Sequence, residues 1–229
     1  MSATIGTVAL LARYPVKSMA GEYPSEATVE RRGLAGDRGW AVYTADGGIG
    51  SSKTTRRFRR VDGLLDWRSE LADGVPVVEA PGGVRGRADD PATGALLSSA
   101  VGRPVTLRPE AEIPHHDESP VHVVTTAALR ALERLLGTSV DVARFRPNVV
   151  LETECDLEVG RELRLGDEVV LRLGPGMPRC VMVDLPQRDL PCDGRILKAL
   201  GEVGDPTFGL QASVRRSGTV RVGDPAALL

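Results

Sequence analysis

The sequence contains few aromatic residues and no surplus of positive charge, and both shortages exclude a class of partner. Aromatic residues make up 3% of the 229 residues, so the core must be aliphatic and a base-stacking surface is disfavoured. Basic and acidic residues nearly balance, with a formal net charge of −2. Because no excess of cations exists to neutralise a phosphate backbone, we expect no nucleic-acid partner.

Cysteine is also scarce, at Cys155, Cys180 and Cys192, with no CxxC pair. An odd number of dispersed cysteines argues against a disulfide framework, a zinc ribbon or an iron–sulfur module. No apolar run approaches the length of a membrane span. The apolar segment near the N-terminus follows no basic cluster, so we interpret it as a strand and not a signal peptide. A cytoplasmic protein without a membrane partner is expected.

Short apolar stretches separated by turn residues predict a mainly β fold with a few helices, of the α+β class. Helical spacing of leucines predicts one helix over Thr126–Leu136, and a cap at Asp193 predicts another that ends at Leu200. Residues 82–94, rich in Gly, Asp, Arg and Pro, are predicted to form a loop. Strands are expected at 4–13, 40–44, 75–79, 105–108, 149–152, 162–165, 169–173, 211–215 and 219–222. This pattern favours a partly closed β-barrel with helical additions.

The loop-rich middle of the chain suggests two parts of different character. We place an N-terminal β-rich segment at residues 1–115 and a second domain at 116–229, with the early strands as candidates to complete the barrel.

Of the three cysteines, Cys180 has the surroundings most suited to chemistry. It follows Arg179 after a Gly- and Pro-rich bend, and a cation beside a thiol favours the thiolate that binds metal or attacks. The alternative is a buried structural cysteine at the start of a strand. Cys155, in an acidic loop, and Cys192, after Pro191, are interpreted as spare thiols.

All three histidines, His115, His116 and His122, fall within eight residues, which invites a metal site. Adjacent histidines usually point apart, however, and no second ligand pair has matching spacing. We therefore interpret them as ordinary loop residues.

Two short segments could hold an anion. Lysine occurs only at Lys17, Lys53 and Lys198 among 29 basic residues. Lys17 and Ser18 follow the first strand, where charge, hydroxyl and backbone amides can bind phosphate; a solvated turn is the alternative. Arg38 adds a positive charge before another strand.

The segment at 144–148 is denser in polar groups. Arg144 and Arg146 flank Phe145, and Pro147 precedes Asn148. A guanidinium fork and an amide suit an anionic heterocycle; a salt-bridged segment before a strand is the alternative. No glycine-rich nucleotide signature and no GxSxG elbow is present.

In order, these pieces resemble one family, over about Ile5 to Asp224. The motifs are Tyr14-Pro-Val-Lys-Ser18, Gly36-Asp-Arg-Gly-Trp40, Arg144-Phe-Arg-Pro-Asn148, Arg179-Cys180, Phe208-Gly209 and Gly218-Thr-Val-Arg-Val-Gly-Asp224. The chain is similar to MOSC-domain proteins (molybdenum cofactor sulfurase C-terminal type) with an N-terminal β-barrel segment. Within them it looks closest to the amidoxime-reducing and N-hydroxylated-compound reductase branch.

The resemblance implies a barrel like that of the pyruvate kinase β-barrel domain and a molybdenum–molybdopterin cofactor, with no pyridoxal phosphate. Cys180 matches the molybdenum ligand and is the implied catalytic residue. The resemblance implies that the other matched residues correspond to positions that hold the cofactor's phosphate end (Lys17, Ser18 and Arg38), surround the pterin (Arg146 and Asn148) or approach the cofactor (Arg179 and Ser119). Pro178 departs from the family, in which serine often precedes the Arg-Cys pair, and the chain is shorter than many reductases.

Three functions follow as hypotheses. The first is a molybdenum-dependent oxidoreductase that removes oxygen from N-hydroxylated or related small molecules, with electrons from a separate donor protein. The second is a cofactor carrier or sulfur-transfer protein that uses a Cys180 persulfide. The third is a binding protein whose cofactor site has decayed.

Overall fold

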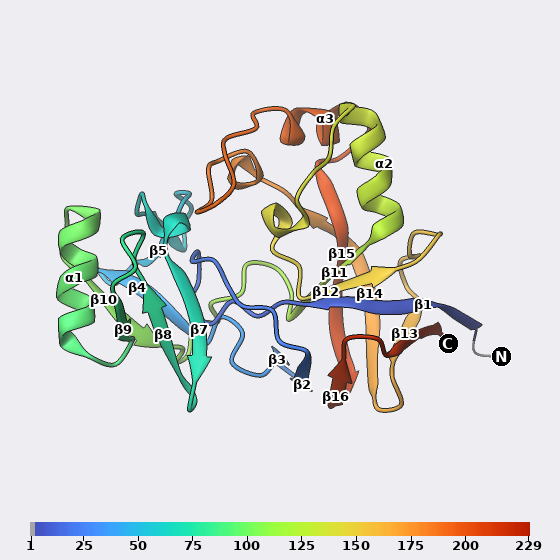
Figure 1. Cartoon of the computed structure of the whole chain (residues 1–229), viewed down its shortest axis with the longest axis horizontal. Coiled ribbons are helices and arrows are strands. Elements are labelled where there is room, and N and C mark those ends of the chain that lie inside the picture. Colours follow the sequence, from blue (N-terminus) through green and yellow to red (C-terminus); the bar gives the residue numbers. More distant parts are fainter. Residues whose placement is uncertain (1–2) are drawn as a thin grey trace.

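The computed structural model describes residues 3–229. Its largest sheet is a closed barrel of seven strands (Figure 1). Only β11 and β12 pair in parallel; the other neighbours are antiparallel. In order around the barrel the strands are β1 (Ala3–Leu11), β12 (Val149–Glu152), β11 (Val121–Thr125), β15 (Thr207–Arg216), β14 (Val169–Pro178), β13 (Glu162–Leu165) and β17 (Pro225–Leu228). The first strand therefore closes a barrel that is otherwise built from the C-terminal half.

Alternation of side chains along these strands explains the barrel core. In β13, Leu163 and Leu165 are buried while their neighbours are partly exposed, as expected for a strand with one face inward. The strand β11 is buried along its whole length, and its residues Val121 and Val123 belong to this core. The core contains no aromatic side chain: its buried members are aliphatic, in agreement with the low aromatic content.

The N-terminal half adds three small sheets (Figure 1). One contains β10 (Val105–Pro109), β4 (Trp40–Thr44), β5 (Ile49–Ser51) and β6 (Phe58–Arg60). The second contains β7 (Arg68–Ala72), β8 (Val75–Glu79) and β9 (Arg85–Arg87). The third joins β2 (Glu26–Glu30) and β3 (Gly33–Leu34) to β16 (Gly218–Arg221). A second hydrophobic core, with Trp67 and Leu97 among its buried members, packs the first two sheets against α1 (Pro91–Val101).

The prediction of a loop over residues 82–94 is wrong. Residues 85–87 form β9, which pairs with β8, and α1 begins at Pro91. The Asp90 carboxylate accepts a hydrogen bond from the Ala92 amide at 2.8 Å. Asp and Pro are common in loops, but they are also common at the start of a helix, as N-cap and first helical residue. The composition of this segment therefore did not distinguish the two.

The helix α2 (Thr126–Leu136) has the bounds that the sequence predicts. Thr125 Oγ1 accepts a hydrogen bond from the Ala128 amide at 3.0 Å, and the chain leaves the helix at Gly137 with φ of 68°. A threonine N-cap and a glycine after the last turn are common at helix ends, and both can be recognised in the sequence.

The second predicted helix begins later than expected, as α3 (Ile196–Glu202). Asp193 is not its cap: that carboxylate pairs with Arg195 at 2.8 Å. Asp184, a residue twelve positions before the helix, accepts hydrogen bonds from the amides of Ile196 and Leu197 at 2.9 and 3.3 Å. A cap supplied from so far away carries no local sequence signal.

Three short 3₁₀ turns complete the fold, at Leu64–Asp66, Val142–Phe145 and Val181–Val183. Sequence reasoning does not predict β2, β3, β5–β7, β9, β11 or β17, each of which has five residues or fewer. Among residues 3–229, no helix combines the length and apolarity needed to cross a membrane.

Candidate functional site

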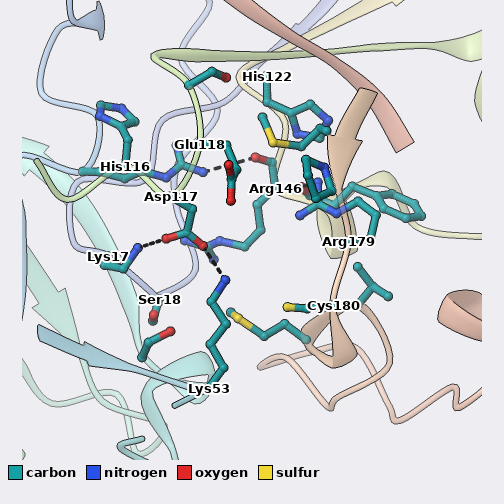
Figure 2. A pocket seen from close by; sticks show the side chains of 18 of the residues that line it. Lys17, Ser18, Lys53, His116, Asp117, Glu118, His122, Arg146, Arg179 and Cys180 are labelled. Atoms are coloured by element: carbon teal, nitrogen blue, oxygen red, sulfur yellow. Dashed lines mark hydrogen bonds and ion pairs between the residues drawn. The ribbon is translucent and has the colours of Figure 1, made fainter. Parts of the chain in front are cut away.

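A polar pocket lies where the N-terminal sheets meet the barrel. Its lining includes all eight residues that the sequence singles out for cofactor or metal binding: Lys17, Ser18, Arg38, Ser119, Arg146, Asn148, Arg179 and Cys180. They are spread over more than 160 residues of the chain. The fold therefore brings every predicted site residue to one cavity. Figure 2 labels several of these residues, among them Lys17, Arg146 and Cys180.

Cationic side chains dominate this pocket. Two carboxylates, Asp117 and Glu118, also line it. The cationic residues are Lys17, Arg38, Lys53, Arg144, Arg146 and Arg179. An excess of fixed positive charge in a partly enclosed site favours an anionic ligand with several acceptor groups.

The turn after β1 places Lys17 and Ser18 inside the protein. Their solvent exposure is 4% and 3%, which rules out the solvated turn that the sequence left open. The Lys17 amide donates to Trp40 O at 2.9 Å, and its ammonium donates to His115 O at 2.8 Å. Burial lowers the pKa of Lys17 to about 8, although the neighbouring Asp117 opposes this fall.

Arg38 is held by the buried carboxylate of Asp37. Arg38 Nη1 donates to Asp37 Oδ2, and Asp37 Oδ1 accepts from the Tyr14 amide at 2.8 Å. Burial alone would raise the pKa of Asp37, but the Arg38 charge and the Tyr14 amide keep that pKa well below its usual range. The pair fixes the Arg38 guanidinium at the cavity wall.

Arg146 and Arg179 carry buried donors that no protein group satisfies. Arg146 Nη2 and Arg179 Nε are both inaccessible to solvent and have no hydrogen-bond partner among the described residues. Burial lowers the pKa of each guanidinium to about 10, so both stay charged at neutral pH. A buried charged donor without a partner is costly, and a bound acceptor would remove that cost.

Three residues of the pocket adopt left-handed backbone conformations that non-glycine residues seldom use: Ser18 at φ 68°, Arg38 at φ 50° and Arg146 at φ 53°. Among the described residues only Asp73 and Arg188 share this feature without being glycine. Such strain concentrates at functional sites, where the surrounding fold holds it in place.

Cys180 lies two residues after the end of β14 and directly before the turn at Val181–Val183, so it follows a strand and does not begin one. It is partly exposed, whereas Cys155 and Cys192 are exposed and lie outside the pocket lining. Cys180 is thus the single cysteine available to a ligand in this cavity.

The buried Arg144 secures the segment after Cys180. It forms no salt bridge with any carboxylate in residues 3–229, contrary to one interpretation of the sequence. Its guanidinium donates to Val183 O at 3.3 Å and to Pro191 O. Gln187 adds hydrogen bonds from its amide to Arg144 O and Met182 O at 3.3 and 3.0 Å. These bonds fix the position of the pocket wall that carries Cys180.

Asn148 and Ser119 line the pocket but already have protein partners. Asn148 Oδ1 accepts from the His122 amide at 3.1 Å, and its Nδ2 donates to Ala12 O at 3.3 Å. Ser119 Oγ donates to Val121 O at 2.9 Å. Asn148 therefore joins the residue that follows β1 to β11, and it also lines the cavity.

The histidines do not form a metal site. His115 is buried, with Nε2 at 2.9 Å from Tyr43 Oη and Nδ1 at 3.0 Å from Arg38 O, and burial lowers its pKa to about 4. His122 is in β11, so its assignment to a loop is wrong; its Nε2 lies 2.9 Å from Phe208 O. Within residues 3–229, no group of three His, Cys, Asp or Glu side chains could hold a metal ion.

Sequence reasoning missed Lys53 and Asp117 as members of the site. Asp117 Oδ1 accepts from Lys17 Nζ, and Asp117 Oδ2 lies 3.0 Å from Lys53 Nζ (Figure 2). Burial would raise the pKa of Asp117, but the two ammonium groups pull it well below its usual range. The scarcity of lysine was the one feature of the sequence that could have indicated Lys53, because two of the three lysines of the chain contact Asp117 here.

Fold and pocket together define a β-barrel protein with a cation-lined cavity whose lining contains one cysteine, Cys180. The description "MOSC domain" matches residues 110–227, and "MOSC N-terminal beta barrel domain" matches residues 5–89. The chain belongs to the MOSC domain family.

Named relatives agree with this assignment. The chain is 27% identical to human mitochondrial amidoxime-reducing component 1, over 98% of this chain and 83% of that protein. It is 32% identical to rat mitochondrial amidoxime reducing component 2 over 50% of this chain and 38% of that protein. The fold is like that of the YuaD protein from Bacillus subtilis, with a TM-score of 0.57 at 14% identity, covering 100% and 97% of the two chains.

Proposed function

We propose that this protein binds molybdenum–molybdopterin in the cation-lined pocket and reduces N-hydroxylated or related small molecules. The observation that carries the proposal is the convergence of Cys180 with the unpartnered donors of Arg146 and Arg179 on one cavity. The kinship with amidoxime-reducing components supports the reaction class.

The residues present fit such a cofactor. Its phosphate needs cations and hydrogen-bond donors, which Lys17 and Arg38 supply. Its planar, polar ring system needs donors at its edges, which the free nitrogens of Arg146 and Arg179 offer. A thiolate is a soft ligand for a thiophilic metal, and Cys180 is the cysteine in the lining.

The chain's own residues would bind and orient, while the cofactor supplies a metal that changes between Mo(IV) and Mo(VI) as oxygen is removed from the substrate. Asp37 would hold Arg38 in place, and Arg144 would hold the Cys180 segment. Conversion of an N–OH group to N–H consumes two electrons and two protons and releases water. Because three dispersed cysteines cannot supply the four clustered ligands of an iron–sulfur module, the protein would take those electrons from a separate carrier protein.

The test is molybdenum content per chain, with pterin fluorescence, after expression in a host that makes the cofactor. We expect near-stoichiometric metal in the wild type and loss of metal in Cys180→Ala. Cys192→Ala, which changes an exposed cysteine outside the pocket, is the matched control and should retain the metal. Turnover of an amidoxime with an added electron donor then tests the reaction.

Absence of metal from a folded wild-type protein would overturn the proposal. An extra sulfur atom on Cys180 in the mass spectrum, without molybdenum, would instead support the carrier or sulfur-transfer function. Absence of both metal and pterin binding would support a site that no longer binds cofactor.

A further inference from the structure

The Lys17–Asp117–Lys53 cluster combines two cations from the N-terminal half with one carboxylate from the segment before β11 (Figure 2). Both ammonium groups also lie near one aromatic ring: Lys17 Nζ is 4.2 Å and Lys53 Nζ 5.6 Å from the centroid of the Phe58 ring. Two cations are thus held together over a single ring, and Asp117 offsets their repulsion.

The three members differ in their access to water. The Lys17 side chain is 5% exposed and that of Lys53 is 23% exposed, whereas the Asp117 side chain is 36% exposed. Asp117 lies in an irregular segment between β10 and β11. Asp117 can therefore leave the cluster and be hydrated, while Lys17, fixed by its hydrogen bond to His115 O, cannot.

A phosphate monoester would compete well for the place that Asp117 occupies. It carries a charge of about −1.5 to −2 near neutral pH and three acceptor oxygens, against one charge and two oxygens for a carboxylate. The lining that surrounds it already contains Ser18 and Arg38, next to Lys17.

We propose that Lys53 binds the phosphate group of the ligand together with Lys17, and that Asp117 is a resident counter-ion which the phosphate displaces. This rests on the proposed function for the identity of the ligand, but the anion site itself does not require molybdenum. Asp117 offsets one of the two lysine charges in the ligand-free protein and selects against weakly charged anions, which cannot displace it.

Calorimetric titration of the cofactor-free protein with inorganic phosphate and with phenyl phosphate, at pH 6.5, tests the proposal. That pH lies below the Lys17 pKa of about 8, so the Lys17 side chain is charged. We expect Lys53→Met to weaken phosphate binding about tenfold and Asp117→Asn to strengthen it about three- to tenfold. The matched control is Lys198→Met, at the remaining lysine, whose side chain is 80% exposed; its affinity should equal that of the wild type.

Equal affinity in Lys53→Met and wild type would refute the role of Lys53. Unchanged or weaker binding in Asp117→Asn, with its circular dichroism spectrum intact, would refute displacement. Tighter binding of phenyl phosphate than of inorganic phosphate would indicate a site for a phosphate monoester, as in the cofactor; the reverse preference would overturn the assignment to the cofactor's phosphate end.

A measurement on the unmodified protein covers the case in which Asp117→Asn does not fold. Acetic anhydride labels accessible amines, and peptide mass spectrometry reports each lysine separately. Phosphate should slow labelling of Lys53 severalfold and leave Lys198 unchanged; equal rates with and without phosphate would contradict the proposal. None of these assays measures molybdenum. Phosphate binding at Lys53 can therefore be confirmed when the metal-loading test fails, and metal loading can be confirmed when Lys53 does not bind phosphate.

Discussion

Replacement of Lys17 by methionine should stabilise the protein at pH 7. Burial lowers the pKa of Lys17 from 10.5 to about 8. At about 1.4 kcal/mol for each pH unit, keeping the ammonium charged in this site costs about 3 kcal/mol relative to the unfolded chain. That cost already includes the attraction to Asp117. Methionine has nearly the same shape and no charge, so Lys17→Met removes the cost.

Part of the gain is lost again, because His115 O would lose its hydrogen bond from Lys17 Nζ, worth about 1 kcal/mol. We therefore expect a net stabilisation of about 2 kcal/mol at pH 7, measured by urea unfolding. Lys198→Met, at an exposed lysine, should change stability by less than about 0.5 kcal/mol.

The pH dependence gives an independent check. Between pH 8 and 10.5 the unfolded chain binds the Lys17 proton while the folded chain has released it. The free energy of unfolding attributable to this group should therefore rise with pH across that window, and the rise should be absent in Lys17→Met. A Lys17→Met protein that is less stable than wild type at pH 7 would refute this account of the burial cost.

Three further substitutions test the framework of the site. Asp37→Asn should lower stability at pH 7 by about 3 kcal/mol, because it leaves the Arg38 charge without its buried partner. The pKa of Asp37 is depressed in the folded state, so the stabilisation from this carboxylate is present above about pH 4 and is lost as the pH falls below that. Acid unfolding of the Asn variant should lack this component. Asp184→Ala should cost about 1 kcal/mol in urea unfolding by removing the cap of α3; no change would mean that those amides find other acceptors. Arg144→Met should accelerate amide hydrogen exchange in the segment from Val181 to Pro191 severalfold, and unchanged exchange there would show that the carbonyl contacts of Arg144 do not hold it.

Five of the seven barrel strands could be predicted from the sequence, because their apolar residues form short runs bounded by turn residues; β11 and β17 were missed. The stretch that became β13 and the helix α2 carry strong local signals, and both have the predicted bounds. Strands such as β3 and β5, with two and three residues, are too short to show a period. They exist because neighbouring strands supply their hydrogen bonds, which is a tertiary effect.

The site was predictable to the extent that its residues fall in sequence motifs. Lys17, Arg38 and Arg146 belong to such motifs, and all three line the pocket. Lys53 belongs to none, and its membership depends on a contact with a residue 64 positions away. The partner of α3, Asp184, is hidden for the same reason: the contact is set by the fold and not by spacing in the chain.

The concentration of buried positive charge in the pocket explains why the Asp117 carboxylate lies between Lys17 and Lys53. Lys17, Arg146 and Arg179 all have pKa values lowered by burial, which means that the folded protein pays for their charge. A cavity that holds several such cations without a ligand is destabilised by their mutual repulsion, and one carboxylate offsets only part of it. A polyanionic ligand would offset the rest, so its binding should stabilise the fold in proportion to its charge. Thermal unfolding of the cofactor-free protein should therefore shift upward more with pyrophosphate than with phosphate, and more with phosphate than with chloride at equal ionic strength. Equal shifts for the three anions would show that the cations of this pocket do not act together.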